Sequence, residues 1–299
     1  MTSSLTGKPV LVASDGSAGA NAAARVAAAI AAKHGAVPQV VRAYDTSRTA
    51  LPGPITSMLA AADAMMDPRV HEPQRNVVRT ELRALFGREM HWPVHIHAGT
   101  PAGVIAREAV ETNAALIVMG MRRHGLFDRV VHDETTLNVM RAAPCPVLGV
   151  APSLTVLPRS AIVGMDFSPA AWQAARLALD LLDPHGTLVL VHVTGVREEG
   201  GPPRPASAPY EIEAELDRVV ADLAPAAGVT TTRLQFDGSA LPSTAAALLA
   251  VAGEHLADLV AVGSRRAPWL ERTLAESVST DLARDGRHTL LVVPPLHPA

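Results

Sequence analysis

The sequence is poor in cysteine, in aromatic residues and in runs of one kind of charge. Its single cysteine, Cys145, excludes an internal disulfide framework and fits a reducing compartment. Aromatic residues make up only 3% of the chain, so alanine, valine and leucine must fill the core. The net charge is −3 and no lysine- and arginine-rich run occurs, which argues against nucleic acid or an anionic membrane as the main partner.

Long apolar segments are also missing. The apolar run at residues 10–13 is too short for the hydrophobic part of a signal peptide, and no stretch approaches the roughly 20 apolar residues of a membrane helix. We therefore predict a cytoplasmic protein without a membrane partner. A length of 299 residues with 48% hydrophobic content suits two globular domains.

What the sequence does contain is an internal repeat. Three segments of the first half recur in the same order in the second: VLVASDGS (10–17) as AIVGMDFS (161–168), LIVMG (116–120) as LVAVG (259–263), and CPVLGV (145–150) as HTLLVV (288–293). Self-similarity of this kind indicates repeated structural units. We predict two domains, residues 1–152 and 159–299, joined by a short linker.

Each half alternates apolar strands with helical patterns. This alternation predicts an α/β fold of two tandem Rossmann-like domains, each a five-stranded parallel sheet with helices on both faces. Ser17 and Ser168 are predicted to cap the first helix of each half, and Gly35 and Gly186 to end it in a left-handed conformation.

Two excursions rich in proline and glycine, residues 45–74 and 194–209, are predicted to be mostly loop. Met58, Met65 and Met66 in the first excursion are expected to be local core, with a lid over the cleft as the alternative.

The candidate site lies where the strand order of such a sheet reverses, beyond the carboxyl ends of the strands. Asp15 and Asp166 follow the first strands, where a carboxylate can either bind a ribose or cap its own turn. Gly120 and Gly263 follow the fourth strands, where glycine can either admit a phosphate beside arginines or form a tight turn. The candidate nucleotide-binding residues are Asp15, Ser17, Gly120, Arg122, Arg123, Asp166, Ser168, Gly263, Ser264, Arg265, Arg266 and Ser277.

These features resemble the universal stress protein family over essentially all of both halves. The resemblance rests on the two Asp-x-Ser turns, on VMG (118–120) with its basic loop, and on the closing APCPVL (143–148). It implies a tandem form like a fused dimer, an intramolecular pseudo-dimer in which the fifth strands pair within the chain. A homodimer of the whole chain and protein partners of unknown identity stay open. The resemblance also places Asp15 and Asp166 by a ribose, and the strand-four glycines by phosphates.

One branch of that family binds ATP through Gly-x-x-Gly, nine further residues, and then Gly-Ser or Gly-Thr. Here the second glycine position holds Arg123 or Arg266, and the Gly-Ser position holds Asp133–Glu134 or Glu276–Ser277. A carboxylate where a phosphate would rest repels it, by roughly 4 kcal/mol for unit charges 4 Å apart at a dielectric constant of 20. The same acids complement the dipole of the helix that they begin.

We therefore predict a non-enzymatic stress-response module that acts through protein interaction, with degenerate phosphate-binding motifs. The alternative is a stress protein that binds an adenine nucleotide, ATP or AMP, mainly in the second half, which keeps Ser264 and Ser277. Slow ATP hydrolysis stays open, and no cofactor is certain.

Other chemistry finds less support. His95 and His97 share one face of the predicted third strand, with His91 before it, but no cysteine or carboxylate lies close in sequence to complete a ligand set. We predict a partly exposed strand and no metal site. A Gly-x-Ser-x-Gly nucleophile motif is absent, no catalytic residue is assigned, and Cys145 is predicted to be a core residue within the fifth strand.

Overall fold

The chain divides into two compact units, residues 1–155 and 156–299. The computed structural model describes residues 3–44, 71–121, 133–196, 209–226, 228–264 and 278–295. Within these ranges, no helix combines the length and the apolar character that crossing a membrane requires.

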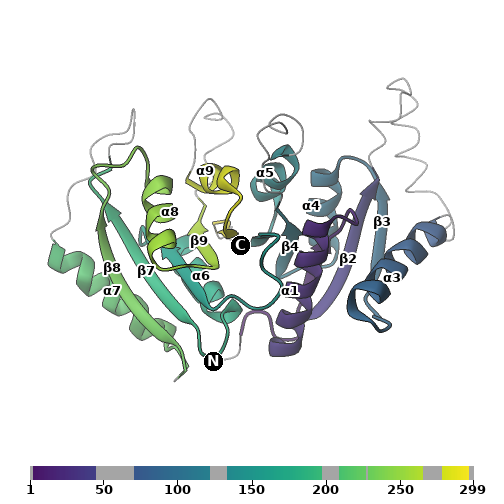
Figure 1. Ribbon diagram of the computed structural model, residues 1–299, viewed down its shortest axis with the longest axis horizontal. Coiled ribbons are helices and arrows are strands. Elements are labelled where there is room, and N and C mark those ends of the chain that lie inside the picture. Colours follow the sequence, from purple (N-terminus) through teal and green to yellow (C-terminus); the bar gives the residue numbers. More distant parts are fainter. Residues whose placement is uncertain are drawn as a thin grey trace. The chain divides into compact units, whose positions relative to one another are not determined.

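Strands and helices alternate along the first unit (Figure 1). Its described elements are β1 (Pro9–Ala13), α1 (Ala18–His34), β2 (Val37–Tyr44), α3 (Glu72–Phe86), β3 (Val94–Ala98), α4 (Pro101–Glu111), β4 (Leu116–Gly120), α5 (Asp133–Ala142) and β5 (Val147–Val150).

The second unit repeats this order. Its described elements are β6 (Ser160–Gly164), α6 (Pro169–Leu181), β7 (Thr187–Thr194), α7 (Pro209–Leu223), β8 (Thr230–Asp237), α8 (Thr244–Glu254), β9 (Leu259–Gly263), α9 (Val278–Asp285) and β10 (Thr289–Val293).

The strands of each unit form a parallel sheet. Their order is β3-β2-β1-β4-β5 in the first unit and β8-β7-β6-β9-β10 in the second. The order reverses between β1 and β4, and again between β6 and β9. The carboxyl ends of these two pairs are therefore the places where such sheets bind ligands.

Helices cover both faces of each sheet. In the first unit α1 and α3 lie on one face and α4 and α5 on the other, while in the second unit α6 and α7 lie opposite α8 and α9 (Figure 1). Central strands covered on both sides have continuous apolar sequences, and residues 10–12, 116–118 and 161–163 have no exposed surface. The five parallel strands with helices on both faces confirm the predicted fold class.

The first helix of each unit begins as predicted. The hydroxyl oxygens of Ser17 and Ser168 accept hydrogen bonds from Ala20 and Ala171, which satisfies one of the free N–H groups at each helix start. Gly35 ends α1 with φ 63°, as predicted, and its N–H donates to the carbonyl of the preceding turn.

The predicted end of the corresponding helix in the second unit is wrong. α6 ends at Leu181, and Leu182 is extended with ψ 152°, so the helix stops before Gly186 rather than at it. Asp183 precedes Pro184, and a residue before proline avoids helical geometry. Gly186 closes the following turn instead, where its N–H donates to the carbonyl of Asp183.

The loop predicted for residues 45–74 extends too far, because its last residues belong to a helix. α3 begins at Glu72 with a proline in its first turn, a place that suits proline because its missing N–H would have no partner there. Residues 45–70, which include Met58, Met65 and Met66, lie outside the described residues, as do residues 197–208 of the second excursion.

Candidate functional site

Each strand-order reversal carries the same turn. A carboxylate oxygen of Asp15 accepts the N–H of Ser17 at 2.9 Å, and one of Asp166 accepts the N–H of Ser168 at 3.0 Å. Such a carboxylate mimics a backbone turn and holds the loop that joins strand to helix. The geometry matches the capping alternative raised from the sequence, and the ribose-binding role of these residues stays a prediction.

Removing the serine cap is expected to weaken either unit to a similar degree. Ser17→Ala and Ser168→Ala each leave one N–H of a helix start without its partner, a loss of about 1 kcal/mol. For a unit of this size the thermal midpoint should fall by about 2–4 °C. Ser17→Asp and Ser168→Asp serve as controls because aspartate also caps, and equal midpoints for the alanine and aspartate variants would contradict the assignment.

The two strand-four glycines lie against the first helices. A Cβ on Gly120 would lie 2.2 Å from the carbonyl carbon of Gly19, and one on Gly263 would lie 2.5 Å from the backbone nitrogen of Ala171. Both distances are far below van der Waals contact. The positions therefore require glycine for packing of strand against helix, whatever their part in binding a phosphate.

In the first unit an ion pair lies against the Asp15 turn. The Nε of Arg42 donates to the carbonyl of Ser14 at 3.1 Å, while its guanidinium forms an ion pair with Glu81 of α3. A carboxylate oxygen of Glu81 lies 3.1 Å from the place of a Cβ on Gly16. This corner of the first sheet thus holds a half-buried arginine and a carboxylate that are already paired.

The second unit has aromatic rings at the equivalent place. His192 corresponds to Arg42, because its Nδ1 contacts the carbonyl of Met165 at 2.7 Å just as Arg42 contacts Ser14. The ring of Phe167 stacks on that of His192, with centroids 4.9 Å apart and planes inclined by 22°. Phe167 adopts φ 60°, a left-handed conformation that is uncommon for a bulky residue.

Several predicted site residues lie outside the described residues, namely Arg122, Arg123, Arg265, Arg266 and Ser277. Ser264 is described, and its N–H donates to the carbonyl of Val293 at 2.7 Å. α5 begins at Asp133, so the acidic pair of the first unit stands at a helix start, as the sequence predicted.

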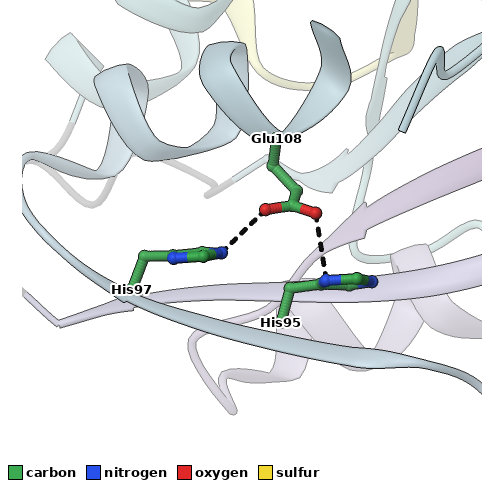
Figure 2. A group of neighbouring side chains, drawn as sticks. All are labelled: His95, His97 and Glu108. Atoms are coloured by element: carbon green, nitrogen blue, oxygen red, sulfur yellow. Dashed lines mark hydrogen bonds and ion pairs between the residues drawn. The ribbon is translucent and has the colours of Figure 1, made fainter. Parts of the chain in front are cut away.

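A further group of polar side chains lies between β3 and α4. Figure 2 shows His95 and His97 side by side, both turned toward Glu108 of α4. Nδ1 of His95 is 3.0 Å from one carboxylate oxygen, and Nε2 of His97 donates to the other at 2.7 Å. Glu108 is 2% exposed. Burial alone raises the pKa of Glu108, but the hydrogen bond from His97 and the charges of both histidines outweigh it and hold the pKa below its usual value.

Sequence reasoning missed Glu108. It considered only carboxylates close to the histidines along the chain, whereas Glu108 comes from the next helix. A signal was present: Glu108 falls among the buried residues Val104, Ile105 and Ala109 of α4, a helical stripe in which a charged residue is costly to bury without a partner.

Cys145 lies just before the fifth strand rather than within it. β5 begins at Val147, because Pro146 has no N–H to donate and instead its carbonyl accepts from Ile117. Cys145 packs against the core cluster of the first unit. Burial raises the pKa of its thiol from 9.0 to about 12, with a hydrogen bond to the Ile117 backbone acting weakly in the opposite direction.

Comparisons with known proteins agree with one another. Residues 7–151 and 159–294 each match the model of the Universal stress protein family. A protein of Thermus aquaticus, "Universal stress protein in QAH/OAS sulfhydrylase 3'region", is 35% identical over 141 residues, which are 47% of this chain and 96% of that protein.

Two solved structures resemble the chain over nearly its whole length. A universal stress protein from Archaeoglobus fulgidus matches with a TM-score of 0.68 at 17% identity, covering 97% of both chains. A putative universal stress protein from Pseudomonas aeruginosa matches with a TM-score of 0.57 at 14% identity, covering 98% of this chain and 95% of the other. At these low sequence identities, the structural similarity shows the fold and nothing more.

Proposed function

Because this chain belongs to the universal stress protein family, with two copies of the family's domain in tandem, we propose that it is a non-enzymatic stress-response module that acts through interaction with other proteins. The observation that supports the proposal is that the candidate site residues already form hydrogen bonds within the protein. Asp15 and Asp166 close their own turns, and Ser17 and Ser168 cap the helices that follow.

The first unit supports the proposal further. A nucleotide at the Asp15 turn would meet the Arg42–Glu81 pair, in which the guanidinium is already neutralised by a carboxylate. Bringing a polyanion next to Glu81 costs electrostatic energy unless the pair separates first. Arg42 also donates to the carbonyl and hydroxyl oxygens of Ser14, next to the turn.

The phosphate-binding positions point the same way. Arg123 and Arg266 stand where the resemblance places a glycine, and Asp133 stands at the start of α5. An acidic residue at a helix start complements the positive end of the helix dipole, which is the attraction that a bound phosphate uses. We infer that the phosphate site is degenerate, most strongly in the first unit.

A second candidate function is the binding of an adenine nucleotide by the second unit. Its support is the stack of Phe167 on His192 beside the Asp166 turn, since an aromatic face offers a planar surface for a base. Asp166 would contact the ribose, and Arg265, Arg266 and Ser277, which lie outside the described residues, would approach the phosphates.

Calorimetric titration with ATP and with AMP tests the leading proposal. On protein stripped of nucleotide, we expect no saturable heat at micromolar concentrations of ATP, because an arginine already paired with a carboxylate lies at the Asp15 turn and an acidic residue begins α5. No release of phosphate from ATP above the buffer rate is expected either. Micromolar ATP binding by the wild-type protein would contradict the proposal.

Matched variants show which of the two units binds a nucleotide. Asp15→Ala and Asp166→Ala remove the same turn hydrogen bond, so their structural cost should be similar. If the second unit binds AMP, Asp166→Ala abolishes the heat while Asp15→Ala leaves it unchanged. The cytoplasmic location, the pairing of the fifth strands within the chain and a homodimer of the whole chain stay predictions.

A further inference from the structure

The side chains of His95, His97 and Glu108 have the composition and spacing of a metal-binding set. The two histidines stand two residues apart on β3 and so project to the same side of the strand. Glu108 reaches both of them from α4, one carboxylate oxygen toward each imidazole (Figure 2). One ligand atom from each residue lies within 4.8 Å of the other two.

The hydrogen bonds around His95 leave its second nitrogen facing an acceptor. Nε2 of His95 is 3.1 Å from the side-chain oxygen of Gln39, which only accepts, so this nitrogen carries the hydrogen. In a neutral ring Nδ1 would then carry the lone pair, 3.0 Å from a carboxylate oxygen of Glu108, whereas in the charged ring Nδ1–H donates to that oxygen. Either a second proton on the ring or a metal ion at Nδ1 therefore makes this contact attractive.

A metal ion would make this contact attractive with the partners already in place. Metal-bound histidine commonly donates its other ring N–H to a carbonyl or carboxylate, as His95 does to Gln39. The Glu108 side chain is only 3% exposed, and a buried carboxylate is costly unless it is paired or coordinates a cation. A divalent ion placed between the three groups would neutralise it.

We propose that Nδ1 of His95, Nε2 of His97 and a carboxylate oxygen of Glu108 bind a zinc ion, with water as the fourth ligand. Two imidazoles and a carboxylate form a ligand set that zinc takes in proteins. The histidine side chains are 30% and 29% exposed, which leaves one side of the site open to solvent for the water.

The three groups would have to move closer to a common centre. Tetrahedral zinc with ligand distances near 2.1 Å sets its ligand atoms about 3.4 Å apart. One ligand atom from each residue now lies within 4.8 Å of the other two, and each histidine contacts a different oxygen of Glu108, so the side chains must shift until both face the same ion. Such an ion would fasten α4 to the edge strand β3.

The test is direct titration of the chelator-treated full-length protein. Zinc chloride is added in competition with a chelator of known affinity, and cobalt chloride in a parallel experiment followed by visible absorption. We expect one ion per chain, bound more tightly than about 1 μM, and the intense absorption of tetrahedral cobalt. No ion bound at that level, or only the weak absorption of octahedral cobalt, would overturn the proposal.

Three variants locate the ion. His97→Ala and Glu108→Gln remove a ligand and are expected to weaken zinc binding at least about a hundredfold, beyond the 10–100-fold loss typical of an outer-shell change. His91→Ala is the matched control, because this exposed histidine lies in the same unit just before β3, and it should bind zinc as the wild type does. Unchanged affinity in the first two variants would place the ion elsewhere and refute the site.

A measurement on the wild-type protein keeps the test decisive if a variant fails to fold. X-ray absorption at the zinc edge counts the imidazole ligands of the bound ion. Two imidazoles with oxygen in the remaining positions are expected, and any other number contradicts the proposal.

Discussion

Gly120→Ala is expected to destabilise the first unit by about 3 kcal/mol or more, and Gly263→Ala the second by a similar amount. The new Cβ of residue 120 would lie 2.2 Å from the carbonyl carbon and 2.5 Å from the carbonyl oxygen of Gly19. In the second unit, the new Cβ of residue 263 would lie 2.5 Å from the backbone nitrogen of Ala171. Backbone atoms cannot rotate away as a side chain can, so α1 or α6 must shift from its sheet. Thermal unfolding should show a midpoint lower by about 6–12 °C.

Gly253→Ala is the control for that experiment. Gly253 lies in α8, and a Cβ there meets nothing within 4 Å. Alanine should stabilise this helix by about 0.5–1 kcal/mol, because glycine loses more backbone entropy on folding. Suppose that Gly120→Ala does not destabilise nucleotide-free protein either. The strand-four glycine is then not needed for packing, and the approach of a phosphate becomes the better explanation for glycine at this position.

Cys145 is expected to react with a thiol reagent at least about tenfold more slowly in the native protein than an ordinary cysteine. Burial raises the pKa of its thiol from 9.0 to about 12, which lowers the thiolate fraction at pH 8 about a thousandfold, while the higher nucleophilicity of such a thiolate offsets part of that loss. The thiolate is the reactive form, so slow labelling by a disulfide reagent is the expected result of the raised pKa and of burial together. Labelling after unfolding in guanidinium chloride should be fast and complete.

The matched control carries an exposed thiol in the same unit. Val110 on α4 is 64% exposed, and Val110→Cys in a Cys145→Ser background should react at the ordinary rate. Native Cys145 reacting as fast as this control would show that the thiol is not held protonated, and would reopen a nucleophilic role. Slow reaction fits the interpretation of Cys145 as a core residue that carries no chemistry.

The strand-four glycines have a structural role that is independent of any ligand. The resemblance places Gly120 and Gly263 beside phosphates, whereas the structure shows that their lack of a side chain is already needed by α1 and α6. A glycine retained for packing persists after a ligand site has been lost. Gly120 and Gly263 are therefore weak evidence for nucleotide binding, and the replaced positions Arg123 and Arg266 weigh more in the proposed function.

Much of the fold followed from local patterns in the sequence. Continuous apolar strands alternating with helical segments predicted a parallel sheet with both faces covered, because burial on two sides leaves no place for polar residues. Ser17 and Ser168 were predictable as caps because a hydroxyl at a helix start serves an N–H only three residues away. The helix end at Leu181 was missed because the turn signal of Gly186 was preferred to the proline before it.

The sequence by itself therefore determined the repeat, which the comparison of its two halves reveals. It also determined the strands, the fold class and the turns that hold the candidate site, since these depend on residues a few positions apart. Only the tertiary structure decided which distant residues meet: Arg42 with Glu81, Phe167 with His192, and Glu108 with His95 and His97. No pattern in the sequence identifies these partners, although the place of Glu108 among the buried residues of α4 indicated that it needed one. The physical reason is that a contact between side chains of different elements depends on sheet register and helix rotation, which the packing of the whole unit sets.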